Sequence, residues 1–142
     1  EKLYEASSYG VPVRLIVRGI CSLLPGVPGL SDNIQATSIL DRFLEHSRLF
    51  IFANGGDPRY YLGSADWMPR NLDYRVEVST PVYAPHIKAE LDQHFEIAWR
   101  DNIKARWHNL AMDNSYREDE REALRSQYAL YDFVSQQLKG KE

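Results

Sequence analysis

The order of apolar and polar residues predicts strands in the first two thirds of the chain and helices in the last third. Val13–Val17 is aliphatic and β-branched apart from one arginine, and RLFIFA, which ends at Ala53, is an apolar run of strand length. NGGD predicts a hairpin turn after this run, RYYLGSA predicts the returning strand, and YRVEVSTPV predicts a third neighbour. IQATSILDRFLEHS fits either a short strand or a helical turn. We therefore expect a β-sheet that contains this hairpin.

Helical periodicity marks both ends of the chain. EKLYEASSYG has the pattern of an amphipathic helix that Gly10 stops. A second helix begins at Pro85, and its apolar stripe consists of Ile87, Leu91, Phe95 and Trp99. A third is expected from about Asp119, with the stripe Leu124, Tyr128, Tyr131, Val134 and Leu138. These elements predict an α/β fold, a mixed β-sheet flanked by α-helices, in a single domain that spans residues 1–142.

Composition narrows the class of protein. The 142 residues are 44% hydrophobic and 26% charged, which is typical of a soluble globular domain. The net charge of -3 argues against general nucleic-acid binding. Cys21 is the single cysteine, so no internal disulfide forms and a cytoplasmic location is expected. Because no capping residue precedes the first helix, we also expect the chain to be a fragment of a longer protein.

The basic residues are unevenly distributed. Between Arg14 and Arg75 the chain has seven arginines and no lysine. A guanidinium offers a rigid, two-pronged donor to phosphate oxygens and keeps its charge when it loses water, so this bias favours oxyanion binding. The alternative is that these arginines are exposed or ion-paired, since six acidic residues lie in the same interval.

His46 is the histidine with the most suggestive surroundings. It lies two residues before Arg48, and residues two apart on an extended backbone project to the same side. An imidazole can exchange a proton near neutral pH while a guanidinium holds an anion, which suits phosphoryl chemistry. His86, His94 and His108 lack the spacing of metal ligands, so we expect no metal site and read all three as structural.

The hairpin brings further polar groups towards His46. Antiparallel pairing places Gly63 and Ser64 near the start of the first hairpin strand, where Gly63 permits close backbone approach and Ser64 supplies a hydroxyl. Asn71 follows on the exit loop, and Arg18 lies where the Val13–Val17 strand ends. The predicted anion-binding residues are Arg18, His46, Arg48, Ser64 and Asn71.

Three long blocks of sequence resemble a known family. VRGICSLLPGVPGLSDNI, FLEHSRLFIFANGGD and LGSADWMPRNLDYRVEV are similar to the last domain of bacterial polyphosphate kinase, which reversibly moves the terminal phosphate of ATP onto polyphosphate. That family in turn resembles phospholipase D, whose motif is His-x-Lys followed by Gly-Ser and Asn. Here His46-Ser47-Arg48, Gly63-Ser64 and Asn71 echo the motif, with arginine in place of lysine. The motif's aspartate has no counterpart at its usual spacing, which argues against phosphodiesterase activity.

The resemblance implies a phospholipase D-like fold and half of an active site. It implies that a phosphorylated histidine is carried on the preceding domain, outside this chain. His46 then matches the second essential histidine, as a catalytic and nucleotide-binding residue, and Arg18 matches an arginine that contacts the ATP phosphates. Mg²⁺ would arrive with ATP and be held mainly by the missing part. The implied partners are ATP, ADP, polyphosphate and the preceding domains of a homo-oligomeric cytoplasmic enzyme, for which peripheral membrane association is left open.

The residues by themselves leave two other functions open. One is a phospholipase D-type phosphodiesterase that acts as a homodimer, with His46 from each chain meeting at a two-fold axis. The other is a non-catalytic oxyanion-binding or oligomerisation module, in which the histidine is incidental.

Overall fold

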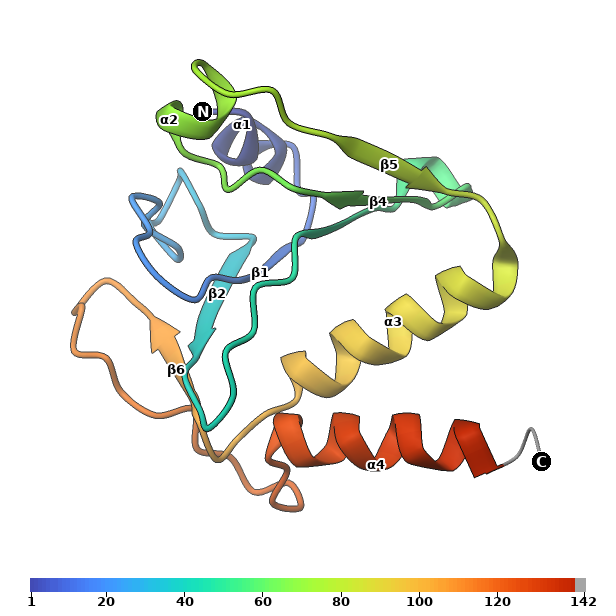
Figure 1. Cartoon of the computed structure of the whole chain (residues 1–142). Coiled ribbons are helices and arrows are strands. Elements are labelled where there is room, and N and C mark those ends of the chain that lie inside the picture. Colours follow the sequence, from blue (N-terminus) through green and yellow to red (C-terminus); the bar gives the residue numbers. More distant parts are fainter. Residues whose placement is uncertain (140–142) are drawn as a thin grey trace. The chain divides into compact units, whose positions relative to one another are not determined.

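The computed structural model describes residues 1–139, which form two compact units. The first unit contains Glu1–Leu44 and the residues from Phe95 onward, and the second contains Glu45–His94. The elements labelled in Figure 1 are, in chain order, α1 (Lys2–Ser8), β1 (Val13–Ile16), β2 (Ile34–Ile39), β3 (Leu49–Phe52), the 3-10 turn η1 (Asn54–Gly56), β4 (Arg59–Gly63), α2 (Pro69–Leu72), β5 (Ser79–Val82), α3 (Pro85–Trp99), β6 (Ala105–His108) and α4 (Ser126–Lys139). None of the helices in the described residues is long and apolar enough to cross a membrane.

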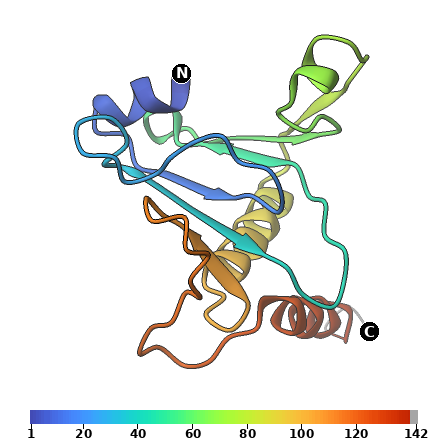
Figure 2. The ribbon, with the colours of Figure 1, turned by 90° about the vertical axis from the view of Figure 1, so that its left-hand side faces the viewer.

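The first unit is built on a mixed three-stranded sheet. Its order is β1-β2-β6, with β1 parallel and β6 antiparallel to the central β2. Figure 2 shows β1 and β2 side by side, in two shades of blue. The core lies along β2, where Ile34 and Ala36 are buried, and Ala105 of β6 is buried opposite Ile39. Because β2 is covered on both faces, its side chains do not follow the simple alternation of a half-exposed strand.

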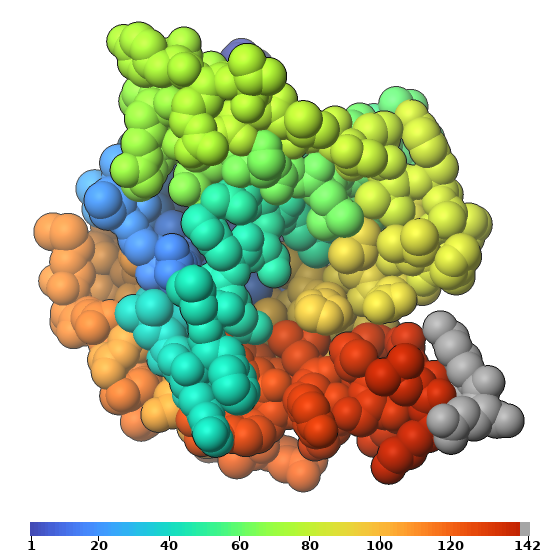
Figure 3. Space-filling view, in the orientation of Figure 1, coloured from blue at the N-terminus to red at the C-terminus, as the bar shows by residue number. Residues whose placement is uncertain are grey.

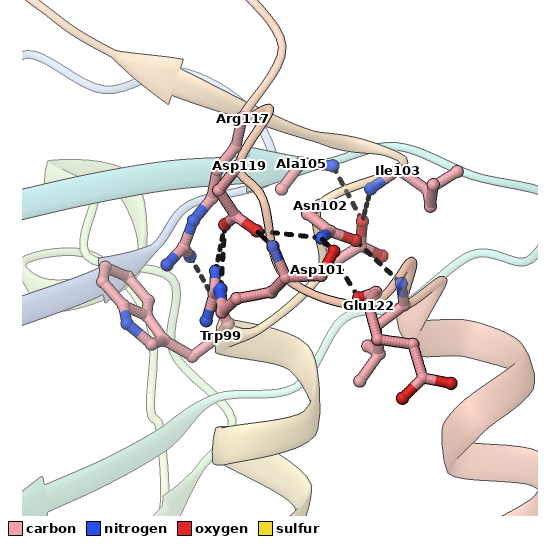
Figure 4. A network of polar contacts seen from close by, with 10 residues as sticks. Trp99, Asp101, Asn102, Ile103, Ala105, Arg117, Asp119 and Glu122 are labelled. Atoms are coloured by element: carbon pink, nitrogen blue, oxygen red, sulfur yellow. Dashed lines mark hydrogen bonds and ion pairs between the residues drawn. The ribbon is translucent and has the colours of Figure 1, made fainter.

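A fully buried carboxylate holds the start of α4 in this unit. The Asp101 Oδ1 atom accepts hydrogen bonds from the backbone N–H groups of Ile103, Lys104 and Ala105, at 3.0, 2.6 and 3.1 Å. Its Oδ2 atom accepts the N–H of Ser126, the first residue of α4, at 2.7 Å. One side chain therefore joins the turn after α3 to the N-terminus of α4. Figure 4 shows Asp101 beside Ile103 and Ala105.

Asn102 fastens the connection that leads into α4. Its Oδ1 atom accepts the Leu124 N–H at 2.7 Å, and its own N–H donates to the Leu124 carbonyl at 3.1 Å. Its Nδ2 group donates to the Asp119 carboxylate at 3.0 Å and to the carbonyls of Arg121 and Glu122 at 3.4 and 3.2 Å. Figure 4 shows Asn102 with two of these partners, Asp119 and Glu122. The segment before Ser126 is thus bound in a non-helical conformation.

The N-terminal end of α4 also holds the chain that leads from β2 towards His46. Arg125 donates two hydrogen bonds to the Asp41 carboxylate, at 2.8 and 2.6 Å. The Gln127 side chain accepts the Phe43 N–H at 2.8 Å and donates to the Phe43 carbonyl at 2.7 Å. The pKa of Asp41 is lowered chiefly by its hydrogen bond with Arg125. These contacts order residues 41–43 within the first unit.

The second unit is an antiparallel sheet of three strands in the order β3-β4-β5. Leu49 pairs with Leu62 and Tyr60 pairs with Val82. Buried Tyr60 donates its hydroxyl to Asp92 of α3 at 2.7 Å, and burial together with this carboxylate raises the Tyr60 pKa to about 12. The segment between β4 and β5, light green in Figure 3, carries the exposed apolar side chains Trp67, Leu72, Tyr74, Val76 and Val78.

Most elements confirm the predictions from the sequence pattern. The first helix, the strand from Val13, the hairpin around NGGD and the helix from Pro85 are all present. The ambiguous stretch IQATSI is strand β2. The fold is α/β with helices around a mixed sheet, as expected, although the strands are divided between two small sheets.

Four details differ from the predictions. The third hairpin strand begins only at Ser79, and the last helix begins at Ser126 instead of about Asp119, because Asn102 binds the intervening segment. Strand β6 and the short helix α2 were not predicted. β6 lacks a periodic pattern and depends on its pairing with β2, and a four-residue helix is too short to show periodicity.

Candidate functional site

His46, Arg48 and Asp66 form a compact polar cluster in the second unit. The His46 Nε2 atom lies 2.8 Å from Asp66 Oδ1, and Arg48 Nε donates to the same oxygen at 3.0 Å. Arg48 Nη2 lies 3.0 Å from His46 Nε2 and 3.4 Å from Nδ1. The prediction that His46 and Arg48 share one side of the chain is consistent with these distances. One carboxylate oxygen therefore contacts both the imidazole and the guanidinium.

The charges of this cluster favour an ionised carboxylate. The hydrogen bond from His46 lowers the pKa of Asp66, and although partial burial raises it, the hydrogen bond and charge of Arg48 lower it further. An ionised carboxylate is purely an acceptor, whereas the arginine is purely a donor. The His46 side chain is 43% exposed, so a ligand in solvent can reach the ring.

The hairpin itself positions Asp66. The Gly63 N–H donates to the Arg48 carbonyl at 2.9 Å, which continues the pairing of β3 with β4 up to the cluster. A Cβ atom on Gly63 would lie 3.1 Å from the Phe50 ring, so glycine permits this close approach. Trp67, directly after Asp66, stacks on Phe50 with ring centroids 5.3 Å apart. Asp66 is therefore held between a paired glycine and a stacked tryptophan.

Ser64 binds different partners from those predicted for the anion site. Its hydroxyl donates to the Glu77 carboxylate in a short hydrogen bond and accepts the Val78 N–H at 3.0 Å. Its own N–H donates to the Val78 carbonyl at 2.9 Å. Arg75 lies 3.2 Å from Glu77, so this carboxylate has two neighbours. Within residues 1–139, no hydrogen bond joins Ser64 to His46.

Asn71 lies in α2 and is buried, with an exposed fraction of 2%. Its Oδ1 atom has no hydrogen-bond partner among the described residues. No hydrogen bond joins it to His46 or Arg48 in that part of the chain. Its role in anion binding stays a prediction.

Arg18 belongs to the first unit and follows the end of β1. The residue is exposed, and its guanidinium makes no hydrogen bond or ion pair within the region the structure describes. Such a side chain is available to an anionic ligand. Its convergence with His46 on one pocket stays a prediction.

Asp66 is the residue of this cluster that the sequence reasoning missed. It lies inside the block LGSADWMPRN, two residues after Ser64, but its spacing from His46 differs from that of the aspartate in the phospholipase D motif. The signal that could have identified Asp66 lies in the local sequence. An acid directly after a strand that pairs with the His46 segment is close enough to bind a histidine and an arginine.

Residues 1–139 contain no group of three or more histidine, cysteine, aspartate or glutamate side chains that could hold a metal ion. Within the His46–Arg48–Asp66 cluster the donors also do not suit Mg²⁺, because its carboxylate, Asp66, already contacts His46 and accepts from Arg48. No chemistry in this chain is therefore assigned to Mg²⁺.

The cluster combines the groups that phosphoryl chemistry requires. An exposed imidazole can accept or donate a proton, and a guanidinium beside it can neutralise a phosphate oxygen. Apart from the imidazole, the cluster contains no strong nucleophile with a base beside it. The arrangement fits binding and proton transfer at a phosphoryl group.

Comparison with known proteins gives a consistent match. The family model "Polyphosphate kinase C-terminal domain 2" matches residues 1–127. The polyphosphate kinase of Escherichia coli (strain K12) is 50% identical over 135 residues, which cover 94% of this chain and 20% of that protein. The polyphosphate kinase of Vibrio vulnificus (strain YJ016) is 48% identical over 134 residues, which cover 94% of this chain and 19% of that protein.

A solved structure agrees with these relatives. The crystal structure of polyphosphate kinase from Porphyromonas gingivalis superposes with a TM-score of 0.93 at 41% sequence identity. The match covers 98% of this chain and 22% of that chain. The chain therefore spans about one fifth of the length of the proteins that it resembles.

Proposed function

Because this chain belongs to the polyphosphate kinase C-terminal domain family, we propose that it is the C-terminal catalytic part of an enzyme that reversibly transfers the terminal phosphate of ATP to polyphosphate. The observation that carries the proposal is an exposed His46 imidazole and a partly buried Arg48 guanidinium on one carboxylate, within a chain that matches the family along nearly its whole length. In this role the chain supplies nucleotide- and phosphate-binding residues, His46, Arg18, Arg48, Ser64 and Asn71.

The proposed mechanism divides the work between two domains. A histidine of the preceding domain attacks the γ-phosphorus of ATP, so that an N–P bond forms, the P–O bond to ADP breaks and ADP leaves. Arg18 neutralises the charge that develops on the phosphate oxygens, with assistance from Arg48. His46 binds the migrating group and gives a proton to the departing ADP oxygen. The terminal oxygen of polyphosphate then takes the phosphoryl group from the phosphohistidine.

The proposed function also requires the preceding domains of the enzyme. The two compact units together form one domain, which the unbroken match of the family model to residues 1–127 supports. The preceding domains provide the phosphorylated histidine and most contacts to Mg²⁺, which accompanies ATP and shields its phosphates. The whole enzyme is a homo-oligomer in the cytoplasm.

Replacement of Arg18 tests this function directly. In the full-length enzyme, Arg18→Ala lowers kcat/KM for polyphosphate synthesis about 100-fold or more, because one donor to a developing oxyanion is lost. Initial rates of ATP-dependent polymer formation measure the change. The matched control is Arg59→Ala, since Arg59 is also exposed and its contact with Asp57 is 3.8 Å long. Near-normal rates in Arg18→Ala contradict the proposed role of Arg18.

The 142-residue chain by itself should form no polymer. It lacks the phosphorylated histidine of the proposed mechanism, so incubation with ATP, Mg²⁺ and polyphosphate yields no longer polymer on gels. A chromogenic phosphodiester in a parallel assay stays intact, which separates the kinase fragment from a phospholipase D-type homodimer. Polymer synthesis by the purified chain contradicts the two-domain mechanism, and diester hydrolysis favours the phosphodiesterase.

A further inference from the structure

The contact between Asp66 and His46 selects one of the two forms of the neutral imidazole. Asp66 Oδ1 lies 2.8 Å from His46 Nε2, a distance typical of a hydrogen bond. An ionised carboxylate has no hydrogen to donate, so the hydrogen of this bond belongs to Nε2. In the neutral ring the other nitrogen, Nδ1, then carries the lone pair.

Arg48 is compatible with the same assignment. Its Nε atom donates to Asp66 Oδ1 at 3.0 Å, so one oxygen accepts from both side chains. Arg48 Nη2 lies near both imidazole nitrogens, but a guanidinium only donates, and Nε2 is already a donor to Asp66. In the neutral ring the lone pair is therefore on Nδ1, which Arg48 Nη2 approaches to 3.4 Å, and a proton that reaches the ring joins this nitrogen.

The backbone around Asp66 gives this contact a defined geometry. Gly63 is paired with Arg48 at 2.9 Å, and Trp67 stacks on Phe50 with an interplanar angle of 6°. The Asp66 side chain is 26% exposed, so it is partly shielded from solvent. A carboxylate held in this way restricts the rotation of a neighbouring ring more than a mobile surface acid does.

We propose that Asp66 is a positioning residue that keeps the His46 proton on Nε2, orients the ring, and leaves Nδ1 as the nitrogen that exchanges the proton with the leaving nucleotide. This inference rests on the proposed function, because it assigns an atom to the proton transfer. In the forward direction the ring starts as the imidazolium, with a hydrogen on each nitrogen; the Nδ1–H bond breaks, the proton moves to the departing ADP oxygen, and the neutral ring keeps its hydrogen on Nε2. In the reverse direction Nδ1 takes that proton back. Asp66 itself touches neither nucleotide nor polyphosphate.

The test is a double-mutant cycle in the full-length polyphosphate kinase. The variants are Asp66→Asn, Asp66→Ala, His46→Ala and the two double variants, with Asp57→Asn as the matched control. Asp57 lies in the turn of the same hairpin, and its side chain is 79% exposed. For each variant, kcat and KM for ATP are measured in polyphosphate synthesis, and thermal unfolding confirms that the variant is folded.

The expected result is a loss that depends on His46. Asp66→Asn lowers kcat about 10-fold to 100-fold, as loss of a residue that orients a functional imidazole does, while KM for ATP stays within about threefold because Arg18 still binds phosphate. In the His46→Ala background the same change alters the residual kcat by less than about threefold, because Asp66 acts through the ring. Asp57→Asn behaves as wild type.

Three results would overturn the inference. The first is a normal or increased kcat in the folded Asp66 variants. An increase would mean that Asp66 competes with the phosphate for Arg48 and His46. The second is an equal loss with and without His46, which is the mark of a general structural role. The third is a rise in KM alone. A failure of the proposed function gives a different result, which is normal activity of His46→Ala, so the two failures can be distinguished. If Asp66→Ala fails to fold, the isosteric Asp66→Asn variant decides.

Discussion

Replacement of His46 by alanine in the full-length enzyme should reduce kcat for polyphosphate synthesis by about 1,000-fold, the size of effect expected when a main catalytic group is lost. The imidazole is the most exposed side chain of the His46–Arg48–Asp66 cluster, and its ring nitrogens can donate or accept a proton. Alanine removes the proton donor to ADP and also leaves Asp66 with Arg48 alone. Initial rates in both reaction directions measure the loss, and both directions should fall together because they share one transition state.

A second histidine provides the control for this prediction. His86 is exposed and lies in the first turn of α3, outside the cluster. His86→Ala should keep the wild-type rate, which separates the role of the His46 ring from a general effect of removing imidazole. A His46→Ala enzyme with more than about one tenth of normal activity would exclude His46 from catalysis.

Replacement of Asp101 by alanine should destabilise the fold by about 3 kcal/mol or more, because buried backbone donors lose their acceptor. Asp101 is fully buried and accepts four backbone N–H groups, three from residues after α3 and one from Ser126. Water cannot replace these bonds without opening the start of α4. Urea unfolding of the chain, followed by circular dichroism, measures the change in the free energy of unfolding.

The Asp101 contribution has a defined pH dependence. Burial by itself raises the pKa of this carboxyl, but hydrogen bonds from the backbone of Lys104, Ser126 and Ala105 outweigh it and hold the pKa below the ordinary value of 3.8. A group with a lowered folded pKa stabilises the fold above its unfolded pKa. The difference between wild type and Asp101→Ala therefore persists at neutral pH and shrinks as the pH falls through the folded pKa.

An exposed aspartate of α4 serves as the control for stability. Asp132→Asn removes a charge from the same helix without removing a buried acceptor, so the free energy of unfolding should change by less than about 0.5 kcal/mol. If Asp101→Ala is as stable as Asp132→Asn, the network in Figure 4 does not hold α4 in place.

Local patterns were sufficient where an element depends on its own residues. The apolar run of β3, the NGGD turn and the helix that begins at Pro85 each occur in the structure near the predicted positions. The turn requires left-handed backbone, with φ of 62° at Gly55, and glycine adopts it without strain. Such features are visible in the sequence because neighbours along the chain carry the information.

Features that depend on distant residues were not visible in the same way. The last helix starts at Ser126 because Asp101, twenty-five positions earlier, accepts its first N–H. β6 exists through its pairing with β2, where Thr37 is opposite Trp107, seventy positions further along the chain. Helix and strand propensities, summed over residues that are adjacent along the chain, contain no information on either of these contacts.

The sequence by itself determined the class of fold, the family to which the chain belongs and the pairing of His46 with Arg48, because a periodic pattern and a long motif are properties of contiguous residues. Only the tertiary structure decided that Asp66 binds both side chains, that Ser64 turns to Glu77 and Val78, and that Asn71 is buried. The physical reason is that a hydrogen bond requires two groups to meet within about 3 Å. Such meetings depend on strand register and on turn geometry, which bring together residues that the chain order keeps apart.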